Sequence, residues 1–84
     1  MDQRREPVRF SREEALSRVG RRVRSIVGFD GLEVGTLGRV MEIDEIEPDG
    51  FELIIEWDSR IEGKFQHDWF TKEQYENSLV EDDA

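Results

Sequence analysis

The sequence predicts a mostly β domain: a small, strongly bent barrel of five strands, with a short helix before it and a short helical turn before the last strand. A run rich in β-branched residues at 21–27 leads into a glycine-punctuated loop, and Gly35 and Gly38 then bracket the entry to a second apolar run. Residues 51–57 alternate strictly between apolar and mostly polar side chains. Glycine permits the positive φ or close backbone approach that a sharply curved strand needs, and alternation marks a strand with one apolar face.

Length and composition limit what this fold can be. The chain has 84 residues and no cysteine, which allows one domain and excludes both a disulfide framework and a thiolate zinc site. No run approaches the roughly 20 apolar residues that cross a bilayer. The first residues, Met-Asp-Gln-Arg-Arg-Glu, lack the apolar stretch of a secretory signal. We therefore expect a cytoplasmic domain that does not insert into membranes.

The N-terminal part divides into a lead-in and a helix. Residues 1–10 are polar and rich in arginine, which predicts a flexible segment. Ser11 and Glu14 have the spacing of a capping box, in which each side chain accepts from the other residue's backbone N–H. A helix is therefore expected over residues 12–19, ended by Gly20.

The first half of the predicted barrel follows directly. β-branched residues indicate a first strand over residues 21–27 and a second over 36–46, and the Pro-Asp-Gly turn at 48–50 predicts that the second strand opens a hairpin. Between the first two strands, three apolar side chains are expected to fold back over the barrel: Phe29, Leu32 and Val34.

The second half contains the remaining strands. Residues 51–57 form the third strand, residues 58–60 a turn and residues 61–66 the fourth strand. Thr71 with Gln74 predicts a second capped helix, and residues 79–81 close the barrel as a fifth strand. The barrel domain thus covers residues 11–80, followed by a frayed, solvated acidic tail at 81–84.

Charge is unevenly distributed. The net charge is −9, yet residues 1–24 carry eight arginines against four acidic residues, a balance of +4, which leaves −13 for the remainder. The basic end and the acidic body should attract one another, within one molecule or between molecules. A chain of this net sign is repelled on average by phosphate backbones and anionic membranes. Nucleic acid is therefore unlikely to be the main partner, although a local arginine patch could override the average.

Three features resemble sites without the residues that a site requires. His67 and Asp68 could form an oriented base, but no nucleophile or second histidine lies beside them. The carboxylates at 44, 45, 47 and 49 lack the EF-hand spacing, so a solvated acidic edge is favoured. The Gly-x-x-Gly pairs at 28–31 and 35–38 are too short and too poor in lysine to hold phosphate. We therefore expect no catalytic residue, metal site or cofactor.

Aromatic residues and arginines are the candidate contacts with a partner. Trp57 and Phe65 are expected in the core, whereas Trp69 is left open between a core residue and an exposed anchor. Tryptophan is over-represented among the residues that dominate binding energy. The candidate partner-binding residues are Trp69, Phe70, Phe29, Arg21, Arg22 and Arg24.

Several short motifs together resemble the SH3-like small barrels. They are Val23-Arg24-Ser25, Phe29-x-Gly31, Gly35-Thr36-x-Gly38-x-Val40, Trp57-Asp58 and Asp68-x-Phe70-x-Lys72-x-x-Tyr75. The entry to the second strand is also similar to the KOW motif. A closer likeness is to small SH3-like accessory subunits of photosynthetic electron transport: the E subunit of photosystem I, the S subunit of the ferredoxin-dependent NDH complex and the variable chain of ferredoxin-thioredoxin reductase.

The resemblance implies a non-catalytic barrel that docks on larger proteins. In some relatives basic residues help to receive acidic ferredoxin; here Arg21, Arg22, Arg24 and Arg39 could do so, but the acidic body departs from that pattern and would sooner meet a basic partner. The first hypothesis is a protein-interaction or accessory-subunit module, monomeric in isolation. The alternative is a KOW-like nucleic-acid-binding barrel that uses the N-terminal arginines. The third and least favoured hypothesis is an enzyme, because no acid, base or nucleophile can be assigned.

Overall fold

The computed structural model of the chain describes residues 9–28, 32–48 and 50–82. In chain order, its elements are α1 (Arg12–Arg18), β1 (Arg22–Ser25), β2 (Leu37–Glu47), β3 (Gly50–Ile61), β4 (Lys64–Phe70), α2 (Lys72–Ser78) and β5 (Leu79–Glu81). The predicted mostly β class is confirmed, with five strands, a helix before the first strand and a helix before the last.

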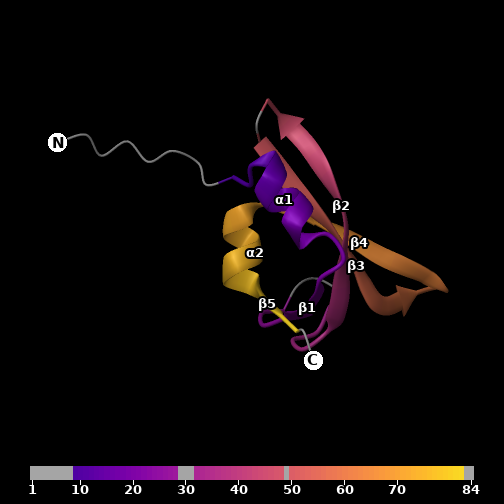
Figure 1. Ribbon diagram of the computed structural model, residues 1–84. Coiled ribbons are helices and arrows are strands. Elements are labelled where there is room, and N and C mark those ends of the chain that lie inside the picture. The colour runs from indigo at the N-terminus through magenta and orange to yellow at the C-terminus, as the bar shows by residue number, and fades with distance from the viewer. Residues whose placement is uncertain (1–8, 29–31, 49, 83–84) are drawn as a thin grey trace.

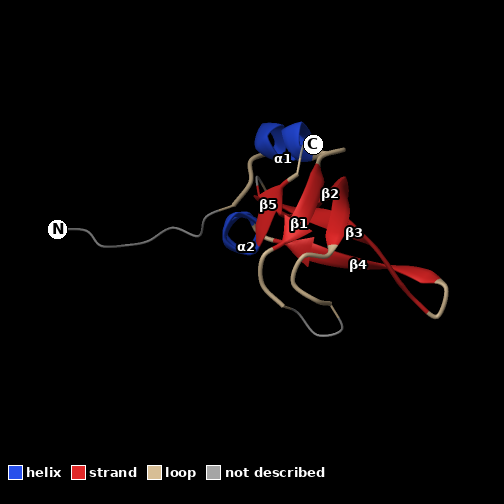
Figure 2. Ribbon diagram, turned by 90° about the horizontal axis from the view of Figure 1, so that it is seen from below, coloured by secondary structure: helices blue, strands red, loops and turns tan. Residues whose placement is uncertain are grey.

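The five strands form one antiparallel sheet in the order β4-β3-β2-β1-β5. Both helices lie on one side of this sheet, α1 against β2 and β3 and α2 against β4 and β5 (Figure 1). The hairpin of β3 and β4 projects beyond the part of the sheet that the helices cover (Figures 1 and 2). The sheet therefore has one covered face and, over β2, β3 and β4, one face without a helix.

The core lies between the sheet and the helices. Alternate residues of β3 point into it, and Leu53, Ile55 and Trp57 are fully buried there. Trp57 packs edge to ring against Phe70, with ring centroids 6.0 Å apart. The alternation predicted for residues 51–57 is confirmed, because a pleated strand sends successive side chains to opposite faces.

Both capping boxes are present. The Ser11 hydroxyl accepts from the backbone N–H of Glu14, and the Glu14 carboxylate accepts from the backbone N–H of Ser11. Thr71 and Gln74 repeat this exchange at the start of α2. α1 ends one residue earlier than predicted, because Val19 is already extended.

Gly35 and Gly38 serve the two purposes that the sequence predicts for glycine. Gly35 adopts a φ of +93°, a conformation that side chains disfavour. Gly38 lies beneath the core tryptophan, where an added Cβ would stand 2.8 Å from Trp57 Cε3 and 3.0 Å from the carbonyl oxygen of Glu56. The entry to β2 is thus close-packed against β3 because residue 38 has no side chain.

The turn predicted at residues 58–60 is wrong. β3 continues to Ile61, and the hairpin turns at Glu62 and Gly63, with φ of 54° and 81°. Positive φ at both central residues is typical of a two-residue hairpin turn. An irregularity in the pairing of β3 with β4 lies between Glu56 and Arg60. β4 consequently starts three residues later than predicted and runs on to Phe70.

The boundaries of the ordered domain also differ from the prediction. Phe10, placed in the flexible lead-in, is fully buried, pairs with Phe51 and packs against the Tyr75 ring at 5.8 Å. The fifth strand predicted over residues 79–81 is confirmed, so Glu81, which the prediction also included in the frayed tail, belongs to β5 and is partly buried. Large apolar surface and cross-strand pairing hold these two ends in place. Residues 1–8 and 83–84 lie outside the described residues.

The loop after β1 is confirmed only in part. Leu32 is buried and belongs to the core, whereas Val34 is 65% exposed and does not cover the sheet. Phe29 lies outside the described residues. Leu32 alone can therefore be assigned the covering role expected for this loop.

Candidate functional site

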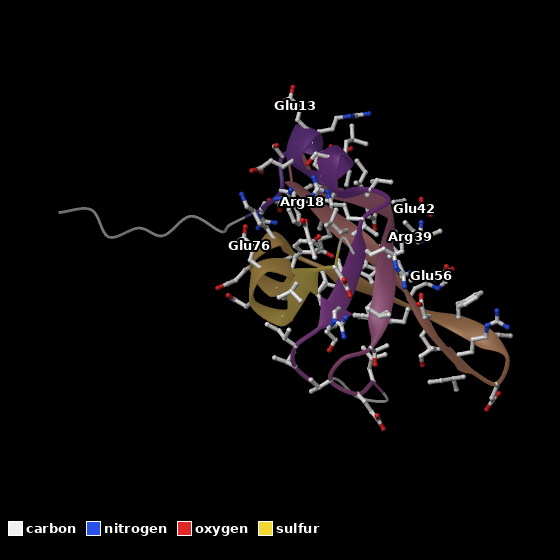
Figure 3. All side chains as sticks on the ribbon, turned by 60° about the horizontal axis from the view of Figure 1, so that its bottom comes forward. Glu13, Arg18, Arg39, Glu42, Glu56 and Glu76 are labelled. Atoms are coloured by element: carbon white, nitrogen blue, oxygen red, sulfur yellow. The ribbon has the colours of Figure 1, made fainter. Side chains whose placement is uncertain are left out.

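The side of β2, β3 and β4 that faces away from the helices is the candidate site, here called the outer face. Since the inner residues of β3 are Leu53, Ile55 and Trp57, the residues between them point outward. Strand register adds their neighbours on β2 and β4. Arg39, Glu42 and Glu56 group together there, away from Glu76 of α2 (Figure 3). The outer face comprises Arg39, Glu42, Asp44, Glu52, Ile54, Glu56, Phe65, His67 and Trp69.

Trp69 is the main feature of this face. It stands on β4 opposite Ile54 of β3, and its indole Nε1 donates to the Asp44 Oδ2 of β2 at 2.9 Å. Neighbouring strands lie about 4.8 Å apart, so a bond from β4 to β2 requires the indole to cross β3. Trp69 nevertheless remains 51% exposed. The structure thus favours the exposed alternative for Trp69, with the ring held in one orientation by hydrogen bonding.

Two more aromatic side chains, Phe65 and His67, lie on β4 on the same face as Trp69. Phe65 pairs with Arg60, whose guanidinium carbon lies 4.2 Å from the ring centroid. His67 Nε2 lies 3.0 Å from the Glu56 Oε2. Residues 65, 67 and 69 share one face because side chains alternate along a strand. We call these three residues the aromatic row.

Phe65 and Phe70 both differ from the prediction. Phe65 was expected in the core but is 41% exposed, because it lies on the face of β4 opposite to Phe70, which no helix covers. Phe70 was expected to contact a partner but is 3% exposed, because it points to the covered face, against Trp57. Trp57 itself is fully buried, as predicted.

His67 and Asp68 do not form a pair. Asp68 Oδ2 accepts from the indole Nε1 of Trp57 at 2.7 Å, whereas His67 contacts Glu56. Adjacent residues on a strand point to opposite faces, which separates the two side chains. The histidine therefore belongs to the aromatic row and the aspartate satisfies the buried indole.

The three candidate arginines are all engaged within the molecule. Arg21 Nη1 donates to Glu81 Oε1 at 2.6 Å, and Arg24 Nη2 donates to Asp82 Oδ2 at 2.5 Å. Arg22 makes a two-pronged pair with Asp58, at 3.1 and 2.7 Å. For these three arginines, the attraction expected between the basic end and the acidic body is realised within the molecule.

Ion pairing shifts the titration of one of these pairs. Hydrogen bonding to Arg22 lowers the pKa of Asp58 below its ordinary value of 3.8, with a smaller contribution from the charge of Arg39. The same hydrogen bond raises the pKa of Arg22. Both groups therefore stay charged over the whole neutral range, and a phosphate would have to displace a carboxylate to reach Arg22.

A second cluster joins the end of β5 to the helices. Glu81 accepts from Arg21, and its other oxygen accepts from the Tyr75 hydroxyl at 2.9 Å and lies 3.7 Å from Arg18 Nε. Burial, and then the hydrogen bond to Glu81, raises the pKa of Tyr75 above its ordinary value of 10.0. This arrangement fixes β5 against α1 and α2, and it is structural in character.

Other kinds of site were sought over residues 9–28, 32–48 and 50–82. This part of the chain shows no surface pocket and no group of three or more histidine or acidic side chains arranged to hold a metal ion. In the same residues, neither helix has the length and apolar character needed to cross a membrane. The carboxylate of Asp44, part of the acidic edge noted in the sequence, is instead bonded to Trp69.

Comparison with protein-family models, curated proteins and solved structures yields no match to this chain. The resemblance to SH3-like barrels therefore stays a prediction from the motifs.

The aromatic row does not follow from the predicted fourth strand, because that strand covers residues 61–66 and leaves His67 and Trp69 outside it. The signal was present: Phe65, His67 and Trp69 have the period of two that indicates one face of a strand. What the pattern does not specify is which face the helices cover, and that decides whether the row is buried.

Proposed function

We propose that this chain is a non-catalytic protein-interaction module, an accessory subunit or adaptor that docks another protein on the outer face around Trp69. The carrying observation is that Trp69 is half exposed yet held by its hydrogen bond to Asp44. Tryptophan buries a large area on binding, and a side chain that is already oriented loses little conformational entropy when a partner covers it.

The charged rim supports the same function. Glu42 and Glu52 form no ion pair among the described residues, and Asp44 lies directly opposite Glu52 across β2 and β3. Like charges in opposed positions of a sheet are unfavourable, and a cation from a partner would relieve them. The outer face therefore suits a basic protein surface better than an acidic one.

No observation favours the nucleic-acid alternative. It uses the N-terminal arginines, and three of these, Arg21, Arg22 and Arg24, each contact a carboxylate of the same molecule. Binding to phosphate would have to break these pairs, and the affinity would fall steeply with salt.

The test is a comparison of captured proteins between the wild-type domain and the Trp69→Ala variant. Both are immobilised and exposed to native lysate with and without nuclease, and retained proteins are identified by mass spectrometry. The proposal expects that a defined protein is retained by the wild-type domain even after nuclease treatment and is not retained by the Trp69→Ala variant. The same protein, once purified, should bind the wild-type domain directly. Leu16→Ala is the matched control, since Leu16 is 52% exposed on α1.

Circular dichroism must show that both variants are folded. Equal capture by wild type and Trp69→Ala would remove Trp69 from the site. Capture that disappears with nuclease would favour the nucleic-acid alternative instead.

A further inference from the structure

β4 is an unpaired edge of the sheet. The strand order ends at β4, which pairs with β3 on one side and, among the described residues, with no strand on the other. In an antiparallel ladder alternate backbone N–H and C=O groups point to each neighbour, so half of those of β4 point outward from the sheet. At seven residues β4 is long enough to template another strand, whereas the opposite edge, β5, has three.

The aromatic row stands on this same strand. Trp69 crosses from β4 toward β2, so the indole lies between the edge and the carboxylates of β2. A strand added to β4 would place every second side chain on the outer face, beside residues 65, 67 and 69. A long side chain at the position next to Trp69 would lie along the indole and point toward the carboxylates of β3, the strand next to β4.

Charge identifies the occupant. The outer face carries four carboxylates, Glu42, Asp44, Glu52 and Glu56, against two guanidinium groups, that of Arg39 and that of Arg60, which lies over the Phe65 ring. Lysine and arginine combine an apolar stem that packs on an aromatic ring with a cation that the ring face and nearby carboxylates attract. A second copy of this chain, with a net charge of −9, would instead bring like charge to the same edge.

We propose that β4 binds an extended basic segment of another protein by strand addition, with lysine or arginine at alternate positions facing the aromatic row. This inference rests on the proposed function and names the kind of partner. Backbone hydrogen bonds along β4 provide register, and the alternate cations select the partner through Trp69 and the nearest carboxylates, those of β3.

The probe is a seven-residue peptide, Lys-Val-Lys-Val-Lys-Val-Lys, matched in length to β4. One control peptide carries N-methyl groups on alternate amides, which removes backbone donors but keeps the charge, and another has glutamate in place of lysine. Affinity and site are measured by NMR on the full chain. The two indole N–H signals report separately on Trp69 at the outer face and on Trp57 in the core.

The proposal expects the lysine peptide to shift the Trp69 indole signal, to leave that of Trp57 in place and to slow hydrogen exchange of β4 amides. N-methylation should weaken binding by about tenfold or more, because several backbone hydrogen bonds are lost. The peptide with glutamate in place of lysine should not bind. Trp69→Ala should weaken binding, whereas Val80→Ala, at a similarly exposed position on the opposite edge strand, should not.

Three outcomes would overturn strand addition. Equal binding of the N-methylated peptide would show that cations dock on the outer face without pairing to β4, which leaves the proposed function intact. If the lysine peptide fails to bind while a purified partner still binds through Trp69, the proposal of a basic added strand is rejected and the proposed function stands. Concentration-dependent protection of β4 amides in the free protein would assign the edge to a second copy.

Discussion

Replacing Gly38 with alanine tests whether the close approach of β2 to β3 is necessary. The added Cβ would lie 2.8 Å from Trp57 Cε3 and 3.0 Å from both Glu56 O and Ile55 Cγ2. Carbon atoms pack best at about 3.5–4.0 Å, so the Trp57 ring would have to move by roughly 0.7 Å or more. It has no room to do so, because it is fully buried and packed against Phe70.

The expected cost follows from two opposing effects. Overpacking a core costs about 1–3 kcal/mol, and replacing glycine stabilises by about 0.4–1 kcal/mol through the unfolded chain. The free energy of unfolding should therefore fall by about 1–2 kcal/mol. For a domain of this size, each kcal/mol lowers the melting temperature by roughly 4–8 °C.

The assay is thermal and urea unfolding of the wild type and two variants, followed by circular dichroism and tryptophan fluorescence. Gly28→Ala is the matched control, because among the described residues the nearest atoms to its added Cβ are 3.9 Å away and its φ is not positive. It should unfold at or slightly above the wild-type midpoint. A Gly38→Ala midpoint equal to that of Gly28→Ala would refute the reasoning, because the strands would then have room for a side chain.

Three further predictions concern the ends of the chain and its titrating groups. Phe10→Ala should lower the free energy of unfolding by about 3–5 kcal/mol in urea titrations, since Phe10 is fully buried; a loss below about 1 kcal/mol would place it outside the core. Asp58→Asn should lower the free energy of unfolding by at most about 1 kcal/mol at pH 7, because the ion pair with Arg22 is exposed. Since the pKa of Asp58 is lower in the folded protein than its ordinary value of 3.8, this difference should be present above pH 3.8 and disappear as the pH falls through the pKa of the folded state. A difference that stays constant in acid would contradict this prediction. The pKa of Tyr75, the single tyrosine, is raised, so tyrosinate absorbance should stay absent near pH 10 while the protein is folded, and stability should be lost only as pH rises further; titration at pH 10.0 without unfolding would contradict its burial.

The parts of the fold that the sequence predicts are those determined within a few residues. Both capping boxes, the alternation of residues 51–57 and the use of glycine at position 38 depend on local spacing or on one missing side chain. The hairpin turn was misplaced because Asp58-Ser59-Arg60 has the composition of a turn. In the structure Asp58 pairs with Arg22, which lies 36 residues earlier in the chain.

The candidate site was less predictable than the fold, because it depends on contacts between residues that are far apart in the sequence. Period-two alternation divides a strand into two faces, but it does not say where the covering helices end. Phe65 and Phe70 stand on one strand, yet they are 41% and 3% exposed, because they lie on opposite faces and only one face is covered. The ion pairs of Arg21 and Arg24 join segments 60 and 58 residues apart, and no local pattern specifies them.

These ion pairs determine which surface is left for a partner. Three arginines of the basic end, Arg21, Arg22 and Arg24, are paired with Glu81, Asp58 and Asp82, so these three act as internal counterions. The carboxylates of the outer face have fewer such partners, and they surround the largest exposed ring of the described residues, that of Trp69. The chain, whose net charge after residue 24 is −13, thus places acidic side chains beside an oriented aromatic ring and an unpaired edge strand. A partner that supplies both cations and a strand would satisfy all three features at once, and for this reason we expect a basic extended segment at β4.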